Sequence, residues 1–191
     1  MYHNTTCMEA PVKTIENPVS GEKITIRRIV MESGNEILKG EIHLAPRGCG
    51  PPEHIHPIIE ERFKIRSGAL SAKVNGKVNK YTVGQEIVIR PGVPHRWWND
   101  TDTEIVMDFI VQPALRLDKF LESVFALAQY GKTDDKGLPG LLRMSVIIQK
   151  YWDVVYLAKP PLLVQKIVLS VLSVLGRVLG CRSEYTYPYD K

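Results

Sequence analysis

The sequence predicts a mainly β protein in which a small β-barrel is followed by an α-helical extension. Three observations indicate this fold class. Short β-prone runs punctuated by Gly, Pro and Asn fill the chain up to Pro113, apolar residues at helical spacing fill it after Pro113, and no low-complexity linker separates the two parts. We therefore expect a barrel domain over residues 1–113 and a helical extension over residues 114–191.

Seven runs before Pro113 have the composition of β-strands. They are Lys23–Met31, Glu36–Ala45, Glu61–Arg66, Ala69–Val74, Lys77–Val83, Glu86–Arg90 and Glu104–Val111. Several short strands at close spacing are typical of a sandwich or barrel. Between two of the runs, Asn75-Gly76 predicts a tight type I′ hairpin, because both central residues of that turn have positive φ.

Three helices are expected after Pro113. The apolar residues of the first helix follow the helical period up to Gly131, which supplies a stop, and are Leu117, Phe120, Leu121, Val124 and Phe125. Those of the second continue until Pro160-Pro161 and are Leu141, Met144, Ile148, Tyr151, Trp152 and Val155. The third helix begins at Pro161 and keeps its polar residues on one narrow stripe of Lys166, Ser170, Ser173 and Arg177.

Composition and charge exclude several classes of protein. The 44% hydrophobic and 24% charged residues are those of an ordinary globular chain, and the net charge of +4 comes from dispersed basic residues, which disfavours nucleic-acid binding. Cys7, Cys49 and Cys181 are odd in number and far apart, so they predict neither a thiolate zinc site nor a disulfide framework. With no secretion signal and no apolar run long enough to span a bilayer, we expect a cytoplasmic protein.

One group of residues carries metal chemistry. His54 and His56 are two residues apart and would share one face of a strand, Glu61 opens the next β-prone run, and His95 follows a Gly-Pro turn. Three imidazoles and one carboxylate suit Fe, Mn, Co, Ni, Cu or Zn as a divalent ion. A His-x-His pair taken alone is more often a surface pair, so the surrounding frame decides the interpretation.

The frame consists of two Gly- and Pro-marked motifs. The first runs from Gly48 through His54-Ile55-His56 and Glu61 to Gly68, and the second from Gly84 through Arg90-Pro91-Gly92 and His95 to Asn99. Together they resemble the two consensus motifs of the cupin superfamily, in its single-domain form with one conserved barrel. Arg90 stands where the family pattern usually has proline, a departure in a turn rather than at a ligand.

The resemblance implies a cupin double-stranded β-helix, or jelly-roll, barrel that holds one divalent transition metal through His54, His56, Glu61 and His95. Glu60 is the rival for the carboxylate position, but the six residues between Glu61 and Gly68 fit the frame better.

Strand alternation predicts what surrounds the metal. If Glu61 points inward, Phe63 and Ile65 do so as well, and Trp97 follows His95 inward. These three side chains are candidates for a substrate pocket, although ordinary core filling is an equal alternative for Phe63 and Trp97. The same alternation places Arg62, Lys64, Arg66 and Arg96 outside, which disfavours phosphosugar substrates. His3, His43, Glu53 and Cys49 are interpreted as bystanders.

The resemblance points first to a metal-dependent oxidoreductase, similar to single-barrel dioxygenases, that acts on a small organic substrate, an aromatic one included. A non-redox isomerase or cyclase is the alternative among enzymes, and a ligand-binding cupin without turnover is the alternative outside them. Catalytic residues other than the metal ligands are not assigned by the sequence.

The extension carries more apolar surface than three helices resting on a barrel require. We expect a homodimer whose contact includes Ile167, Val171, Leu175 and Val178. In the competing account, the same residues are buried within one chain over the barrel mouth. Attachment to a membrane surface is a further alternative, but a helix at a membrane surface usually has a strongly cationic polar face, and this one has only two basic residues.

Overall fold

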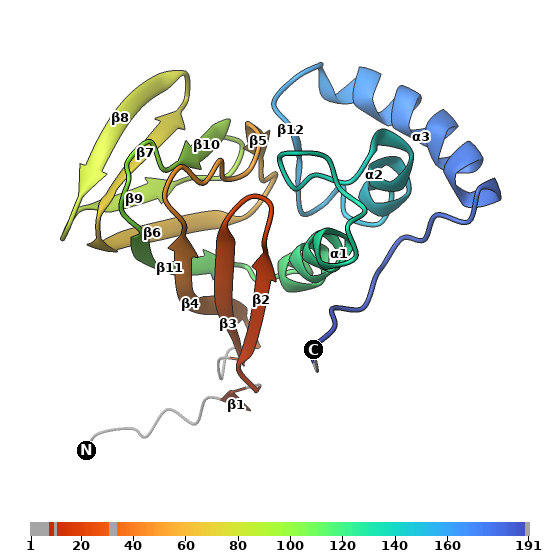
Figure 1. The fold of residues 1–191 in the computed structure, drawn as a ribbon. Coiled ribbons are helices and arrows are strands. Elements are labelled where there is room, and N and C mark those ends of the chain that lie inside the picture. Colours follow the sequence, from red (N-terminus) through yellow and green to blue (C-terminus); the bar gives the residue numbers. More distant parts are fainter. Residues whose placement is uncertain (1–7, 10, 31–33, 190–191) are drawn as a thin grey trace.

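The computed structural model describes residues 8–9, 11–30 and 34–189. Two antiparallel sheets face each other and form the barrel, and three helices lie beside one end of it (Figure 1). The predicted mainly β fold with a C-terminal helical extension is confirmed.

The larger sheet contains seven strands in the order β1-β3-β4-β11-β6-β9, with β2 paired to β3. Their bounds are β1 Met8–Glu9, β2 Lys13–Asn17, β3 Glu22–Val30, β4 Glu36–Leu44, β6 Glu60–Ser67, β9 Glu86–Ile89 and β11 Ile105–Gln112. The smaller sheet has the order β12-β5-β10-β7-β8. Its strands are β12 Tyr156–Leu157, β5 His54–Ile55, β10 His95–Trp98, β7 Ala69–Val74 and β8 Lys77–Thr82.

The seven predicted strands are all present, each within one residue at either end, apart from Met31, which lies outside the described residues. The predicted hairpin is also confirmed. Val74 pairs with Lys77, and the two turn residues Asn75 and Gly76 have φ angles of 48° and 79°. The short strands β1, β2 and β12 were not expected. Both β1 and β2 pair with β3, which follows them in the chain, whereas β12 pairs with the distant β5.

The core lies between the sheets and continues under the helices. In β11, alternate residues are buried, and Met107 and Phe109 point into the barrel. The same buried cluster includes Phe125, Ile147 and Tyr151 from the extension. The barrel and the helices therefore share one hydrophobic core.

The helix α1 (Leu117–Gln129) ends as the sequence predicts and is followed by Gly131 with a φ of 64°. The helix α3 (Leu162–Val178) begins one residue after the predicted Pro161. The helix α2 (Leu141–Ile148) is shorter than expected, so the prediction that Tyr151, Trp152 and Val155 continue it is wrong. Instead, the chain turns after Ile148 and forms β12, which pairs with β5 of the barrel.

Ion pairs and hydrogen bonds join the extension to the barrel. Arg28 of β3 donates to Asp118 of α1 at 2.6 Å and to the carbonyl of Leu115 at 2.8 Å. After α3, the chain returns to the barrel (Figure 1), where the backbone N–H of Glu16 in β2 donates to the hydroxyl of Tyr187 at 2.9 Å. The extension is thus held at both of its ends.

The fully buried residues of α3 are small or polar and are accompanied by partly buried leucines, whereas its outer side is aliphatic and exposed. Gln165, Ser173 and Gly176 are its buried residues, and a Cβ on Gly176 would lie 2.7 Å from Val146 of α2. The expected polar stripe is therefore wrong at Ser173, whose hydroxyl donates to the carbonyl of Ser170. Lys166 and Arg177 are exposed, as expected.

The residues expected in a dimer contact are all exposed within the chain: Ile167, Val171, Leu175 and Val178. The competing account, in which the same chain buries these residues over the barrel mouth, is wrong. Within the ranges that the structure describes, no helix has the length and apolar character needed to cross a membrane.

Gln165 fastens α3 to the segment that precedes it. Its amide group accepts from the backbone N–H of Leu157 at 3.2 Å and donates to the carbonyls of Leu157 and Pro160. Because a buried polar group left without a partner costs about 1–3 kcal/mol, we expect Gln165→Leu to lower the free energy of unfolding by about 2–4 kcal/mol. Urea denaturation measures this change.

The matched control is Gln149→Leu, because Gln149 makes only a 3.4 Å contact with Ser170 at the surface. We expect that change to stay within about 0.5 kcal/mol. Equal effects of the two substitutions would contradict the anchoring role of Gln165.

Candidate functional site

Four titratable side chains from both sheets meet inside the barrel. His54 of β5 and His95 of β10 are directly opposed across an antiparallel pair. His56 follows β5 by one residue, and Glu61 comes from β6 in the other sheet. All four residues are buried, and their nearest ligating atoms lie within 4.8 Å of one another.

The cluster has nearly the size of a site for one metal ion. The ring centroids of His54 and His95 are 4.1 Å apart, and those of His54 and His56 are 4.9 Å apart. The Glu61 carboxylate lies 2.9 Å from Nε2 of His95 and 3.4 Å from Nε2 of His56. Two ligands at about 2.0–2.2 Å from one ion lie at most about 4.4 Å apart.

Each imidazole has one nitrogen held by the backbone. Nδ1 of His54 lies 2.9 Å from the carbonyl of Pro52, Nδ1 of His56 lies 2.6 Å from that of Val154, and Nδ1 of His95 lies 3.0 Å from that of Val93. A carbonyl only accepts hydrogen bonds, so Nδ1 carries the proton in all three rings. In the neutral form of each ring, Nε2 then keeps its lone pair, which faces the centre as a metal ligand requires.

Burial and mutual proximity set the charges in the cluster. Burial, together with the neighbouring imidazoles, holds the pKa of His54 well below its usual value. Burial opposes the charged form of Glu61, but His56 and His95 outweigh it and hold the pKa of that carboxyl well below its usual range. Burial likewise opposes the charged form of His56, whose pKa is nevertheless raised by Glu61.

A divalent transition metal fits these residues. Oε2 of Glu61 and Nε2 of His95 are buried and, among the described residues, neither forms a hydrogen bond of acceptable geometry. Buried polar atoms without a partner are rare, and here they converge with two further imidazole nitrogens on one point. Three nitrogens and one carboxylate form a donor set of the kind that Fe, Mn, Co, Ni, Cu and Zn accept.

The rival carboxylate, Glu60, lies elsewhere. Its side chain forms an ion pair with Arg62 at 2.7 Å and is one-third exposed. Glu61 is therefore the carboxylate that reaches the three imidazoles, as the motif frame favoured.

The cluster borders a cavity of about 170 Å³ between the barrel and the helices. His54, His56 and Glu61 form part of its wall, and most of the remaining wall is apolar. The extension contributes as much of the wall as the barrel does, through residues such as Phe120, Val124, Met144, Ile148 and Leu169. For comparison, an apolar cavity of about 150 Å³ is large enough for benzene.

The three residues predicted to surround the metal are all buried, but only two line the cavity. Phe63 and Trp97 do so, with ring centroids 6.2 Å apart, whereas Ile65 packs in the core away from it. The outward direction expected for the next side chains of β6 is confirmed, because Arg62, Lys64 and Arg66 are exposed.

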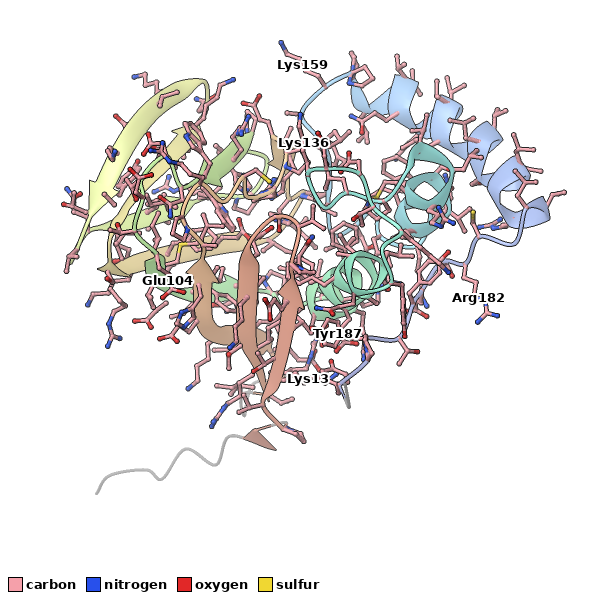
Figure 2. All side chains as sticks on the ribbon, viewed as in Figure 1. Lys13, Glu104, Lys136, Lys159, Arg182 and Tyr187 are labelled. Atoms are coloured by element: carbon pink, nitrogen blue, oxygen red, sulfur yellow. The ribbon has the colours of Figure 1, made fainter. Side chains whose placement is uncertain are left out.

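Several cavity residues were not found from the sequence. Glu22 at the start of β3 is buried, lines the cavity, and accepts a hydrogen bond from Ser20 at 2.8 Å. Burial raises the pKa of Glu22 to about 7. Lys136, in the loop between α1 and α2, contributes an exposed cation to the rim (Figure 2). The sequence gives no signal that Glu22 is buried, because a charged residue at an alternating strand position usually faces water.

The other residues singled out in the sequence lie away from the cluster. His43 contacts Glu41 at 2.6 Å and Glu104 at 3.4 Å, and Glu53 pairs with Lys73 at 3.1 Å. Cys49 is a free thiol 3.6 Å from the carbonyl of Lys136. His3 and Cys7 lie outside the described residues.

Comparisons with known proteins agree with the motif frame. The model of the Cupin_2 family, described as a cupin domain, matches residues 40–111. No curated protein matches the chain.

Solved structures resemble the barrel loosely. An RmlC-like cupin from Shewanella frigidimarina is 17% identical, with 56% of this chain and 88% of that chain covered and a TM-score of 0.46. KdgF from Halomonas sp. is 12% identical, with 55% and 86% covered and a TM-score of 0.43. A sugar phosphate isomerase of the cupin superfamily from Silicibacter pomeroyi is 14% identical, with 57% and 71% covered and a TM-score of 0.43. With both consensus motifs inside the matched segment and the four motif side chains gathered in the barrel, residues 40–111 are a cupin domain.

Proposed function

We propose that this protein is a mononuclear metal-dependent enzyme that oxidises a small apolar substrate with dioxygen. The observation that carries the proposal is the position of the four-residue cluster beside a mostly apolar cavity, with His54, His56 and Glu61 in the cavity wall. His54, His56, Glu61 and His95 would hold the ion. An ion of this kind supplies open coordination positions and, if redox-active, the capacity to exchange electrons with a substrate.

The residues of the chain have separate tasks in this proposal. The rings of Phe63 and Trp97 would pack against the substrate, and the size of the cavity suits a molecule with one aromatic ring. The helices α1 and α3 contribute apolar side chains to the cavity wall, and displacement of water by a substrate bound there would strengthen electrostatic interactions at the site. In a dioxygenase reaction both oxygen atoms enter the product and the substrate supplies the electrons, so no further reductant is needed.

Glu22 favours a second candidate, a non-redox isomerisation or cyclisation. A buried carboxyl with a pKa near 7 can give and take a proton at neutral pH, as general acid–base catalysis requires. In this candidate, Glu22 would move the proton, and an ion held by the four-residue cluster would supply Lewis acidity toward a carbonyl of the substrate.

The ligand assignment predicts about one transition-metal ion per chain. We expect His54→Ala combined with His95→Ala to abolish stoichiometric metal binding, because half of the donor atoms are lost. Elemental analysis after reconstitution measures the metal content. His43→Ala is the control, since His43 lies on the barrel but outside the cluster. Full occupancy in the double variant would refute the assignment.

The raised pKa of Glu22 predicts a pH dependence of stability. The folded chain binds this proton more tightly than the unfolded chain. Ionisation of Glu22 therefore leaves the free energy of unfolding unchanged below about pH 4.5 and lowers it by about 3 kcal/mol above about pH 7. We expect Glu22→Gln to match the wild type near pH 4.5 and to exceed its free energy of unfolding by about that amount at pH 8. Urea denaturation at several pH values measures the difference.

Glu16→Gln is the control for this measurement, because Glu16 is an exposed carboxylate on the neighbouring strand. A difference between Glu22→Gln and wild type that does not change with pH would show that Glu22 is not held protonated at neutral pH.

Oxygen consumption distinguishes the two reactions. Protein reconstituted with each candidate metal is incubated with a panel of one-ring apolar compounds, with and without air. We expect oxygen uptake equal to the amount of product formed, with a redox-active metal only. Turnover without air that is lost in Glu22→Gln would support the second candidate instead. Compounds that bind without turnover in either condition would identify a ligand-binding module and contradict both.

A further inference from the structure

We propose that the outer face of α3 binds to an anionic lipid surface, with the helix lying parallel to that surface. Here the outer face of α3 means the exposed aliphatic side chains Leu163, Ile167, Val171, Val174, Leu175 and Val178. Their exposed fractions range from 49% to 78%. A continuous apolar face of this size on a folded chain is typical of a surface that binds something.

The helix α3 carries more apolar surface than its contact with the rest of the chain covers. A helix that only covers a core turns its apolar side inward and its polar side to water. The inward residues of α3 are Gln165, Ser173, Gly176 and the partly buried Leu169, while a second set of aliphatic side chains on the outer face is exposed. Aliphatic side chains therefore lie on both sides of α3, and the chain itself covers only those on the inner side.

The charge of the same segment selects the partner. Residues 154–183 contain four basic residues, Lys159, Lys166, Arg177 and Arg182, and no Asp or Glu. The whole chain has 25 basic and 21 acidic residues, so its entire net charge of +4 lies in this segment. Lys159 and Arg182 lie near the two ends of α3 (Figure 2). None of the four forms an ion pair within the part of the chain that the structure describes.

An anionic lipid surface satisfies both properties of the segment. Aliphatic side chains enter the boundary between headgroups and acyl chains, while Lys and Arg extend their long stems and keep their charges among lipid phosphates. With 17 residues, α3 is about 25 Å long, and its outer face is apolar over that length.

A second copy of this chain is the less favourable partner. Pairing two α3 helices about a two-fold axis would bring the cations of one segment near those of the other, and the segment offers no carboxylate to offset them. The structure therefore favours lipid over the homodimer expected from the sequence.

Vesicle co-sedimentation tests the proposal with the full-length chain. The probes are vesicles of phosphatidylcholine alone and vesicles in which about a third of the lipid is phosphatidylglycerol. We expect the wild type to bind the anionic vesicles, and Val171→Asp with Val178→Asp to weaken that binding more than about tenfold. We expect Lys166→Gln with Arg177→Gln to weaken it about thirtyfold, because each cation near an anionic surface strengthens binding by a factor of about five.

The control is Val78→Asp with Val83→Asp, which places the same two charges on exposed valines of the distant β8 hairpin. This variant should bind vesicles as the wild type does. Circular dichroism and metal content confirm that each variant folds, so loss of vesicle binding is distinguished from loss of structure or of the proposed enzyme function.

Two results would overturn the proposal. One is a wild type that binds neither kind of vesicle, or an α3 variant that binds as well as the control. The other is a sedimentation-equilibrium mass near twice 21.6 kDa that falls to 21.6 kDa in Val171→Asp with Val178→Asp, without vesicle binding. That second result would assign the outer face of α3 to a second copy.

Discussion

The candidate site depends on the position of β5, a strand of only two residues held between β10 and β12. Pairing with β10 sets His95 opposite His54, and pairing with β12 sets Leu157 opposite His54 on the other side. The turn before β12 supplies the Val154 carbonyl that orients His56. Residues from both sides of Pro113 are thus needed to place the imidazoles, and the helical extension is part of the site rather than an appendage.

Two buried carboxyl groups in one cavity wall meet opposite electrostatic conditions. Glu61 lies among imidazoles that hold its pKa low, so it keeps a negative charge for a cation. Glu22 has a single hydroxyl partner, and burial raises its pKa to about 7. Environments that separate the pKa values of two like groups are typical of sites where one group holds charge and the other moves protons.

Local pattern predicted most of the barrel, and long-range pairing explains what it missed. Alternation and turn residues were sufficient for the β7–β8 hairpin, and the spacing to Gly68 was sufficient to prefer Glu61 over Glu60. The end of α2 could not be predicted in this way, because Tyr151 and Val155 keep a helical pattern while the backbone that follows pairs with β5. The burial of Glu22 and Ser173 likewise follows from contacts with distant segments.

The two sides of α3 meet different surroundings, and this has a thermodynamic consequence. Gln165 and Leu169 border the cavity, while the opposite side of the same helix faces outward. A shift of the helix by a fraction of its diameter changes the cavity wall and the outer face together. A cavity ligand that prefers one position of α3 would therefore change the affinity of the outer face for its own partner. Linkage requires that partner to change the affinity of the cavity ligand by the same factor. The helix α3 thereby joins the cavity wall to the exposed surface of the chain.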